Sequence, residues 1–124
     1  MPGGLRFSIL VVDDEPAVRE IFARCIARRG HHVVTSSTAA DGWDRTQHES
    51  FDVVLCDLVL PDSTGLWLIE RLHSAGCPAR VILLTGRPSP EAARRADELG
   101  VYAFIAKPIR ASALIRVVEQ AALG

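Results

Sequence analysis

Residues 51–65 read FDVVLCDLVLPDSTG, and this stretch predicts how the rest of the chain is arranged. Val53 to Cys56 is continuously apolar and rich in β-branched residues, which is typical of a strand buried on both faces of a parallel sheet. The apolar run ends on a carboxylate, Asp57, and Pro61 and Gly65 then predict a loop. Ligands of open parallel sheets bind at the carboxyl ends of the strands. We therefore expect the chemistry of this protein at Asp57.

Three other apolar segments end on side chains that carry charge or form hydrogen bonds. They are residues 9–12, followed by Asp13 and Asp14, residues 81–84, followed by Thr85, and residues 103–106, followed by Lys107. Parallel strands place their carboxyl ends at one edge of the sheet. The sequence therefore predicts that three acids, a hydroxyl and an amine meet at that edge.

The bulk properties indicate one ordinary soluble domain, residues 1–124, with a short disordered start at about residues 1–5. Apolar residues make up 48% and charged residues 23%, a typical globular composition. The net charge of −1 provides no general attraction to nucleic acid or to a membrane, and no apolar run approaches the roughly 20 residues that span a bilayer. Three widely spaced cysteines fit neither a disulfide framework nor a zinc site. We therefore expect a cytoplasmic protein.

Short apolar strands alternate with amphipathic helices, which predicts an α/β fold with a parallel sheet. The predicted strands are residues 6–12, 32–35, 52–57, 80–85 and 103–106, and the predicted helices are residues 16–29, 39–48, 66–75, 90–99 and 111–122. The first helix carries an apolar stripe at helical spacing that we expect to face the core: Val18, Ile21, Phe22, Cys25 and Ile26.

The helix that begins after Ser89 has a thin inward face. Its expected core residues are Ala92, Ala93 and Ala96, and Leu99 is the single large one. Because burying alanine recovers little hydrophobic free energy, we expect this helix to be the most loosely held.

The predicted cluster has a definite chemistry. Three neighbouring carboxylates repel one another unless a cation is present, and Mg²⁺ prefers such oxygen ligands. A carboxylate at a metal can act as a nucleophile toward a phosphoryl group and form an acyl phosphate. Lys107 offers a compact positive charge for the phosphoryl oxygens, and Thr85 offers a hydrogen bond.

The chain resembles a response-regulator receiver domain of two-component signalling over nearly its whole length. The residues that carry the resemblance are Val11 to Glu15, Asp57 with Pro61 and Gly65, Leu84 to Gly86, and Lys107 with Pro108. The resemblance implies a flavodoxin-like fold: a doubly wound, five-stranded parallel (βα)₅ sheet with strand order 2-1-3-4-5.

The resemblance also implies a phosphoacceptor and a metal site. Asp57 would accept phosphate from a sensor histidine kinase or a phosphotransfer protein. Mg²⁺ or Mn²⁺ would be held by Asp57, by Asp14 directly, by Asp13 mainly through water, and by the backbone carbonyl of Val59.

The remaining implied roles concern signalling. Thr85 and Lys107 would hold the phosphoryl group, and Phe104 would be the switch aromatic whose rotation follows the threonine. The peptide bond before Pro108 would be cis, against the general preference for trans. Val59 has no polar group to orient an attacking water, so we expect slow self-dephosphorylation.

Three positions depart from the family pattern. Thr64 stands where an acid or amide usually precedes the glycine, Leu60 where methionine is common, and Phe104 where tyrosine would carry a hydroxyl. The first two affect the geometry of the loop, and the third affects any partner contact that needs the hydroxyl.

These observations predict a phosphorylation-controlled switch that is not a turnover enzyme. It would act on a partner or output domain through the helix after Ser89, the strand at residues 103–106 and the last helix, with no direct nucleic acid or membrane binding. A homodimer through this surface, and whether the chain stands alone or belongs to a longer protein, are left open. One alternative is a receiver-like module that never needs phosphate. Another is a Mg²⁺-dependent phosphohydrolase, although Val59 occupies the position where that class typically has its second acid.

Other side chains have ordinary interpretations. The three cysteines are expected to pack as apolar groups, the four histidines to be solvated, and Trp43 and Trp67 to pack or lie half exposed. Arg24, Arg28 and Arg29 form either a solvated helix face or part of a docking surface. Arg87 either closes over the phosphate or points to solvent.

Overall fold

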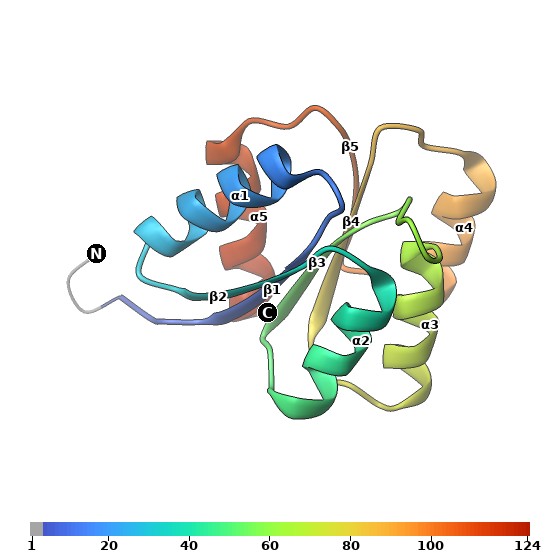
Figure 1. Cartoon of the computed structure of the whole chain (residues 1–124), viewed down its shortest axis with the longest axis horizontal. Coiled ribbons are helices and arrows are strands. Elements are labelled where there is room, and N and C mark those ends of the chain that lie inside the picture. Colours follow the sequence, from blue (N-terminus) through green and yellow to red (C-terminus); the bar gives the residue numbers. More distant parts are fainter. Residues whose placement is uncertain (1–3) are drawn as a thin grey trace.

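The structure, a computed structural model, describes residues 4–124 as one parallel sheet covered by helices on both faces (Figure 1). The strands run in the order β2-β1-β3-β4-β5 and every neighbouring pair is parallel. The elements are β1 (Ser8–Val12), α1 (Pro16–Arg28), β2 (His32–Ser36), α2 (Ala39–His48), β3 (Val53–Asp57), α3 (Gly65–Ser74), β4 (Arg80–Thr85), α4 (Pro90–Glu98), β5 (Ala103–Ala106) and α5 (Ala111–Leu123). The predicted doubly wound α/β fold and strand order are confirmed.

The core consists of two layers because alternate strand residues face opposite sides of the sheet. One layer lies under α1 and α5 and includes Ile9, Leu55 and Ile82. The other lies under α2, α3 and α4 and includes Leu10, Val54 and Leu83. All five residues of β3 are buried, as expected for a central strand with helices on both faces.

Local signals begin and end several helices. Thr38, Thr64 and Ser89 each accept a hydrogen bond on the side-chain oxygen from the amide three residues later, at 3.0–3.1 Å, which satisfies a donor that lacks a partner within the helix. α1, α3 and α4 are followed by the positive-φ glycines Gly30, Gly76 and Gly100, a conformation that glycine adopts without steric cost. The predicted boundaries differ from the observed ones by at most two residues.

Three expectations about burial are wrong. Ile21 of the predicted core stripe is 53% exposed, because Val18, Phe22 and Ile26, spaced four residues apart, form the side of α1 that packs on the core and Ile21 lies beside that side. Ala93 is exposed, so α4 buries Ala92 and Ala96 alone within its helical residues. His31, expected in solvent, is 5% exposed and is hydrogen-bonded at both ring nitrogens.

The first three residues of the predicted disordered start lie outside the described residues, and Gly4 and Leu5 are exposed and irregular. Within residues 4–124, the helices are all too short or too polar to cross a membrane.

Candidate functional site

Three acids converge at the carboxyl edge of the sheet. Ligand atoms of Asp13, Asp14 and Asp57 all lie within 4.8 Å of one another. They come from the ends of the adjacent strands β1 and β3, so the parallel topology brings them together. An open cavity of about 480 Å³ lies beside them, lined by Asp14, Glu15, Asp57, Val59, Thr85, Gly86, Arg87 and Lys107.

Asp57 is the last residue of β3 and is 7% exposed. One carboxylate oxygen accepts a hydrogen bond from Lys107 Nζ at 3.0 Å, and the other accepts from the Val59 N–H at 3.3 Å. The first residue of α3, Gly65, lies against the Asp57 backbone, and a Cβ at that position would overlap the Asp57 carbonyl oxygen. Glycine is therefore required there by the close approach of two backbone segments.

Asp13 and Asp14 have different environments although they are neighbours in sequence. Asp13 is 2% exposed; its carboxylate accepts from Lys107 Nζ at 2.9 Å and from the Glu15 N–H at 3.0 Å. Asp14 is exposed and lines the cavity. Asp14 is thus open to a ligand in the cavity, whereas Asp13 lies behind it and holds the lysine.

Lys107 bridges the two buried acids from the end of β5. Burial alone would lower the pKa of its amine, but hydrogen bonds and the negative charges of Asp13 and Asp57 outweigh burial and raise the pKa. The amine therefore stays protonated as a positive charge between the two carboxylates. The Lys107–Pro108 peptide bond is cis.

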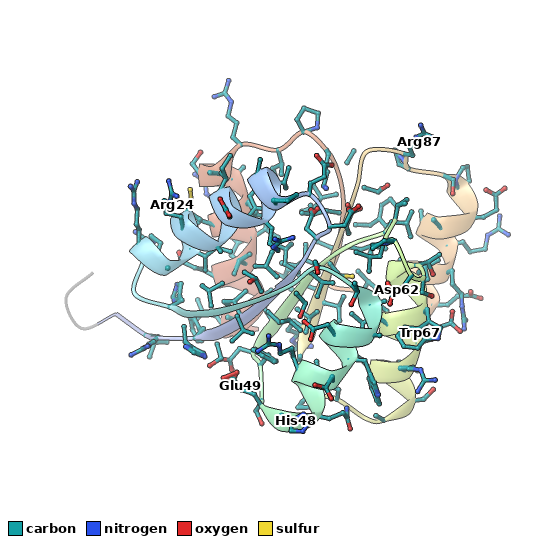
Figure 2. The ribbon with its side chains drawn as sticks, in the orientation of Figure 1. Arg24, His48, Glu49, Asp62, Trp67 and Arg87 are labelled. Carbon is teal, nitrogen blue, oxygen red and sulfur yellow. The ribbon has the colours of Figure 1, made fainter. Side chains whose placement is uncertain are left out.

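Thr85 and Arg87 form one side of the cavity. Thr85 is fully buried at the end of β4, and its hydroxyl oxygen accepts a hydrogen bond from the Arg87 N–H at 2.9 Å. The hydroxyl hydrogen is thereby left to donate elsewhere. The Arg87 side chain is exposed on the loop that leads to α4 (Figure 2).

Two other predicted residues lie at the border of the site. Val59 is 59% exposed at the mouth of the cavity. Phe104 pairs in register with Leu83 and is half-buried in the layer under α3 and α4. It lies on the edge strand β5, directly beside β4, the strand that carries Thr85.

Cys56 immediately precedes Asp57 but points into the core layer on the other side. Burial, together with the charges of Asp57 and Asp13, raises the pKa of its thiol. The thiol is therefore protonated and unreactive, which agrees with its interpretation as an apolar packing residue.

The donor set at this edge suits a hard divalent cation. It consists of carboxylate oxygens of Asp13, Asp14 and Asp57, with no thiolate or imidazole among these ligand atoms. Oxygen-rich sites of this kind favour Mg²⁺ or Mn²⁺ over zinc or copper. The residues present therefore fit the predicted metal.

Comparison with protein families identifies the chain. The family model described as response regulator receiver domain matches residues 9–119. The chain belongs to this family. The receiver domain is 33% identical over 114 residues to the DNA-binding transcriptional regulator NtrC of Azospirillum brasilense, a match that covers 92% of this chain and 24% of NtrC.

Two solved structures resemble the receiver domain closely. A CheY-like receiver domain protein from Methanospirillum hungatei JF-1 superposes with a TM-score of 0.91 at 28% identity and covers 95% of this chain and 94% of that one. A Burkholderia pseudomallei response regulator, solved with a phosphorylated aspartic acid, calcium ion and citrate, superposes with a TM-score of 0.84 at 28% identity. It covers 94% of this chain and 69% of that one.

The receiver domain contains two features that the sequence analysis missed. Asp62, in the loop after Asp57, accepts hydrogen bonds from the first two amides of α2. Glu119 of α5 binds Arg29 and His31 at the opposite edge of the sheet, so Arg29 is not simply solvated. The Asp62-Ser63 pair is a turn signal, but its partners in α2 cannot be read from it.

Proposed function

We propose that this receiver domain is a phosphoacceptor whose phosphorylation on Asp57 switches its surface. The observation that carries the proposal is the placement of Asp57: a nearly buried carboxylate, 7% exposed, beside two further acids and a protonated lysine. A phosphoryl group needs its negative charge balanced on several oxygens at once. The Asp57 neighbourhood offers those contacts.

The metal of this function is Mg²⁺ or Mn²⁺. Asp14 and Asp57 would bind it from the cavity, the backbone carbonyl of Val59 would add a ligand, and Asp13 would act mainly through water. When bound, the metal neutralises the carboxylates and supplies positive charge to the phosphoryl oxygens. The Burkholderia structure, in which a phosphorylated aspartic acid accompanies calcium, supports a cation at the corresponding acids.

The chemical step is in-line transfer of a phosphoryl group. A carboxylate oxygen of Asp57 forms a bond to phosphorus while the bond from phosphorus to a donor histidine nitrogen breaks, and that nitrogen keeps the electron pair. The product is an acyl phosphate on Asp57. The ammonium group of Lys107 would form an ion pair with one phosphoryl oxygen, and the Thr85 hydroxyl would donate a hydrogen bond to another.

The conformational change would pass from Thr85 to Phe104 and then to the surface formed by α4, β5 and α5. Phe104 lies under the thinly packed α4, where rearrangement disturbs little buried area. The donor would be a sensor histidine kinase or phosphotransfer protein in the cytoplasm, and the target a partner or output domain. The domain spans 24% of the Azospirillum NtrC, which is consistent with an output function that lies outside the receiver domain.

The test is intact mass spectrometry after incubation with acetyl phosphate and Mg²⁺. Wild type is expected to gain one phosphate, whereas Asp57→Asn, which keeps the shape but removes the nucleophile, gains none. Adding a chelator before the phosphate donor is expected to abolish the adduct in wild type.

Absence of an adduct on wild type, with BeF₃⁻ also failing to shift the amide spectrum, would contradict the proposal and favour a module that needs no phosphate. Continuous release of phosphate from a small phosphomonoester would contradict it in favour of a phosphohydrolase.

A further inference from the structure

The loop after Asp57 folds into a compact turn at residues 59–64. Val59 and Thr64 pair as an isolated β-bridge, and the Leu60 N–H donates to the Ser63 carbonyl at 3.2 Å. The turn is also anchored at its base, because Leu60 is 6% exposed. We therefore treat residues 59–64 as one unit whose tip is Asp62.

Asp62 joins this unit to the start of α2. Its two carboxylate oxygens accept hydrogen bonds from the Ala39 and Ala40 N–H groups, each at 2.9 Å. Both amides belong to the first turn of the helix, where backbone donors have no partner within the helix. Figure 2 shows Asp62 close to this part of α2. The carboxylate thus ties together segments that are more than twenty residues apart in sequence.

The charge of Asp62 suits this position. Burial alone would raise its pKa, but the hydrogen bonds from Ala40 and Ala39 outweigh burial and lower it. An ionised carboxylate at a helix N-terminus is further stabilised by the helix dipole. The connection is therefore present at neutral pH.

The other end of the same unit lies at the phosphoacceptor. The Val59 N–H donates to the Asp57 carboxylate at 3.3 Å, and Val59 lines the cavity. A ligand that engages the Asp57 carboxylate therefore meets the base of the turn, and the bridge between Val59 and Thr64 connects that base to the rest of the unit.

We propose that Asp62 is a positioning residue that couples occupancy of the carboxylate site to the first turn of α2. This inference rests on the proposed function, and it adds a second responsive region that is separate from the surface of α4, β5 and α5. Because coupling is reciprocal, α2 in turn helps hold Val59 at the cavity.

The competing explanation is that Asp62 is a structural cap and nothing more. α2 provides its own control, because Thr38, the residue directly before the helix, caps the same turn by accepting from the Asp41 N–H at 3.0 Å. Thr38→Ala and Asp62→Ala both remove acceptors from one helix end, but Asp62→Ala alone cuts the connection to the turn. A structural role predicts that the two variants behave alike.

The experiment is a titration with Mg²⁺ alone, followed by ¹H–¹⁵N NMR of the whole chain. In wild type and in Thr38→Ala, the amides of Ala39 and Ala40 are expected to shift in step with the Asp57 amide. In Asp62→Ala, the Asp57 amide still responds while the metal-induced shifts of Ala39 and Ala40 are lost. Asp62→Asn keeps one acceptor oxygen and is expected to retain part of the metal-induced shift at Ala39 and Ala40. It replaces Asp62→Ala in the comparison if Asp62→Ala does not fold.

The outcomes separate the inference from the function on which it rests. Metal-induced shifts at Ala39 and Ala40 that persist in Asp62→Ala, are equally lost in Thr38→Ala, or are missing in wild type while the Asp57 amide responds, would each overturn the coupling. If no wild-type amide near Asp13 or Asp57 responds to Mg²⁺, the metal site of the proposed function fails and the coupling fails with it.

Discussion

On the face of the sheet that carries α1 and α5, large side chains and a partly buried polar clamp hold the helices, whereas α4 on the other face packs through small side chains. Phe22 and Ile26 of α1 and Leu114 and Val118 of α5 are buried in one layer. α4 buries Ala92 and Ala96, with Leu99 at its end. Because hydrophobic stabilisation scales with the apolar area buried, α1 and α5 are held more strongly than α4.

The clamp on the first face consists of Glu119 and two partners. Its carboxylate accepts from Arg29 Nε and Nη2, each at 3.1 Å, and from His31 Nε2 at 2.7 Å. His31 Nδ1 accepts from the Phe7 N–H at 3.1 Å, so its ring hydrogen is on Nε2, toward Glu119. The clamp joins α5 to the loop before β2 and, through His31, to Phe7 directly before β1.

α4 has a weaker polar connection to its neighbour. Arg95 Nη2 lies 3.5 Å from a Glu70 carboxylate oxygen of α3, with both side chains nearly half exposed. Exposed ion pairs of this kind contribute little to stability. By contrast, α2 and α3 are interlocked by Arg71, whose guanidinium lies 4.5 Å from the Trp67 ring centroid and 5.5 Å from that of Trp43.

The difference indicates a division of roles. Asp13 and Lys107 border the firmly held α1 and α5, which keeps the charge constellation in place. Thr85 ends the strand that leads to α4, and Phe104 lies in the core layer shared with α4, a helix that buries only two alanines within its helical residues. A switch needs both a rigid site and an element of low local stability.

The largest expected effect compares matched leucines on the two faces. Leu114→Ala, at a side chain 1% exposed, should lower the free energy of unfolding by about 3–4 kcal/mol through lost burial and a cavity. Leu99→Ala, at a side chain 9% exposed, should cost about 2 kcal/mol because the end of α4 can relax into the space. Urea unfolding measures both, and equal losses would remove the distinction between the faces.

Native-state hydrogen exchange provides the next test. The amides of α4 should open with a free energy roughly 2 kcal/mol below that of the α5 amides around Val118, because little apolar area is exposed when α4 detaches. Uniform protection across the two helices would contradict the prediction that α4 is loosely held.

A smaller effect is expected from Glu119→Gln, and it depends on pH. The hydrogen bond from Arg29, with the hydrogen bond from His31 and the charge of Arg29, outweighs burial and lowers the pKa of Glu119 below its ordinary 4.5. A lowered folded-state pKa means that the ionised carboxylate stabilises the fold above 4.5 and that this stability is lost as the pH falls through the folded-state pKa.

Glu119→Gln should therefore lower the free energy of unfolding by roughly 1 kcal/mol at pH 7. The difference from wild type should shrink toward zero in strong acid, where Glu119 is protonated too. Urea titrations at the two pH values measure it, and a difference that grows on acidification would have the wrong sign for this clamp.

The smallest effect is expected at the connection between α3 and α4. Glu70→Gln removes the charge that faces Arg95 and should change the free energy of unfolding by about 0.5 kcal/mol or less. Thermal or urea unfolding at low and high salt measures it. A loss of unfolding free energy as large as that of Glu119→Gln would show that the ion pair with Arg95 holds α4 firmly. That result would contradict our conclusion that α4 is weakly held.

Much of this protein was determined by local sequence. The apolar runs that end on Asp13, Asp57, Thr85 and Lys107 predicted both the strands and the edge at which the four side chains meet, because parallel strands must share that edge. Capping residues and glycines predicted the ends of the helices, because each acts on backbone groups within a few positions of itself.

Tertiary structure alone decided the features whose partners are distant. His31 is buried because Glu119, 88 positions away, receives its ring hydrogen, and Asp62 caps a helix that begins 23 positions before it. Ile21 has the helical spacing of a core residue, yet it is 53% exposed while Phe22 and Ile26 of the same helix are buried in the core. Spacing within a segment indicates which residues share a face of a helix or strand. Their burial and their hydrogen-bond partners depend on which part of the folded chain lies opposite that face.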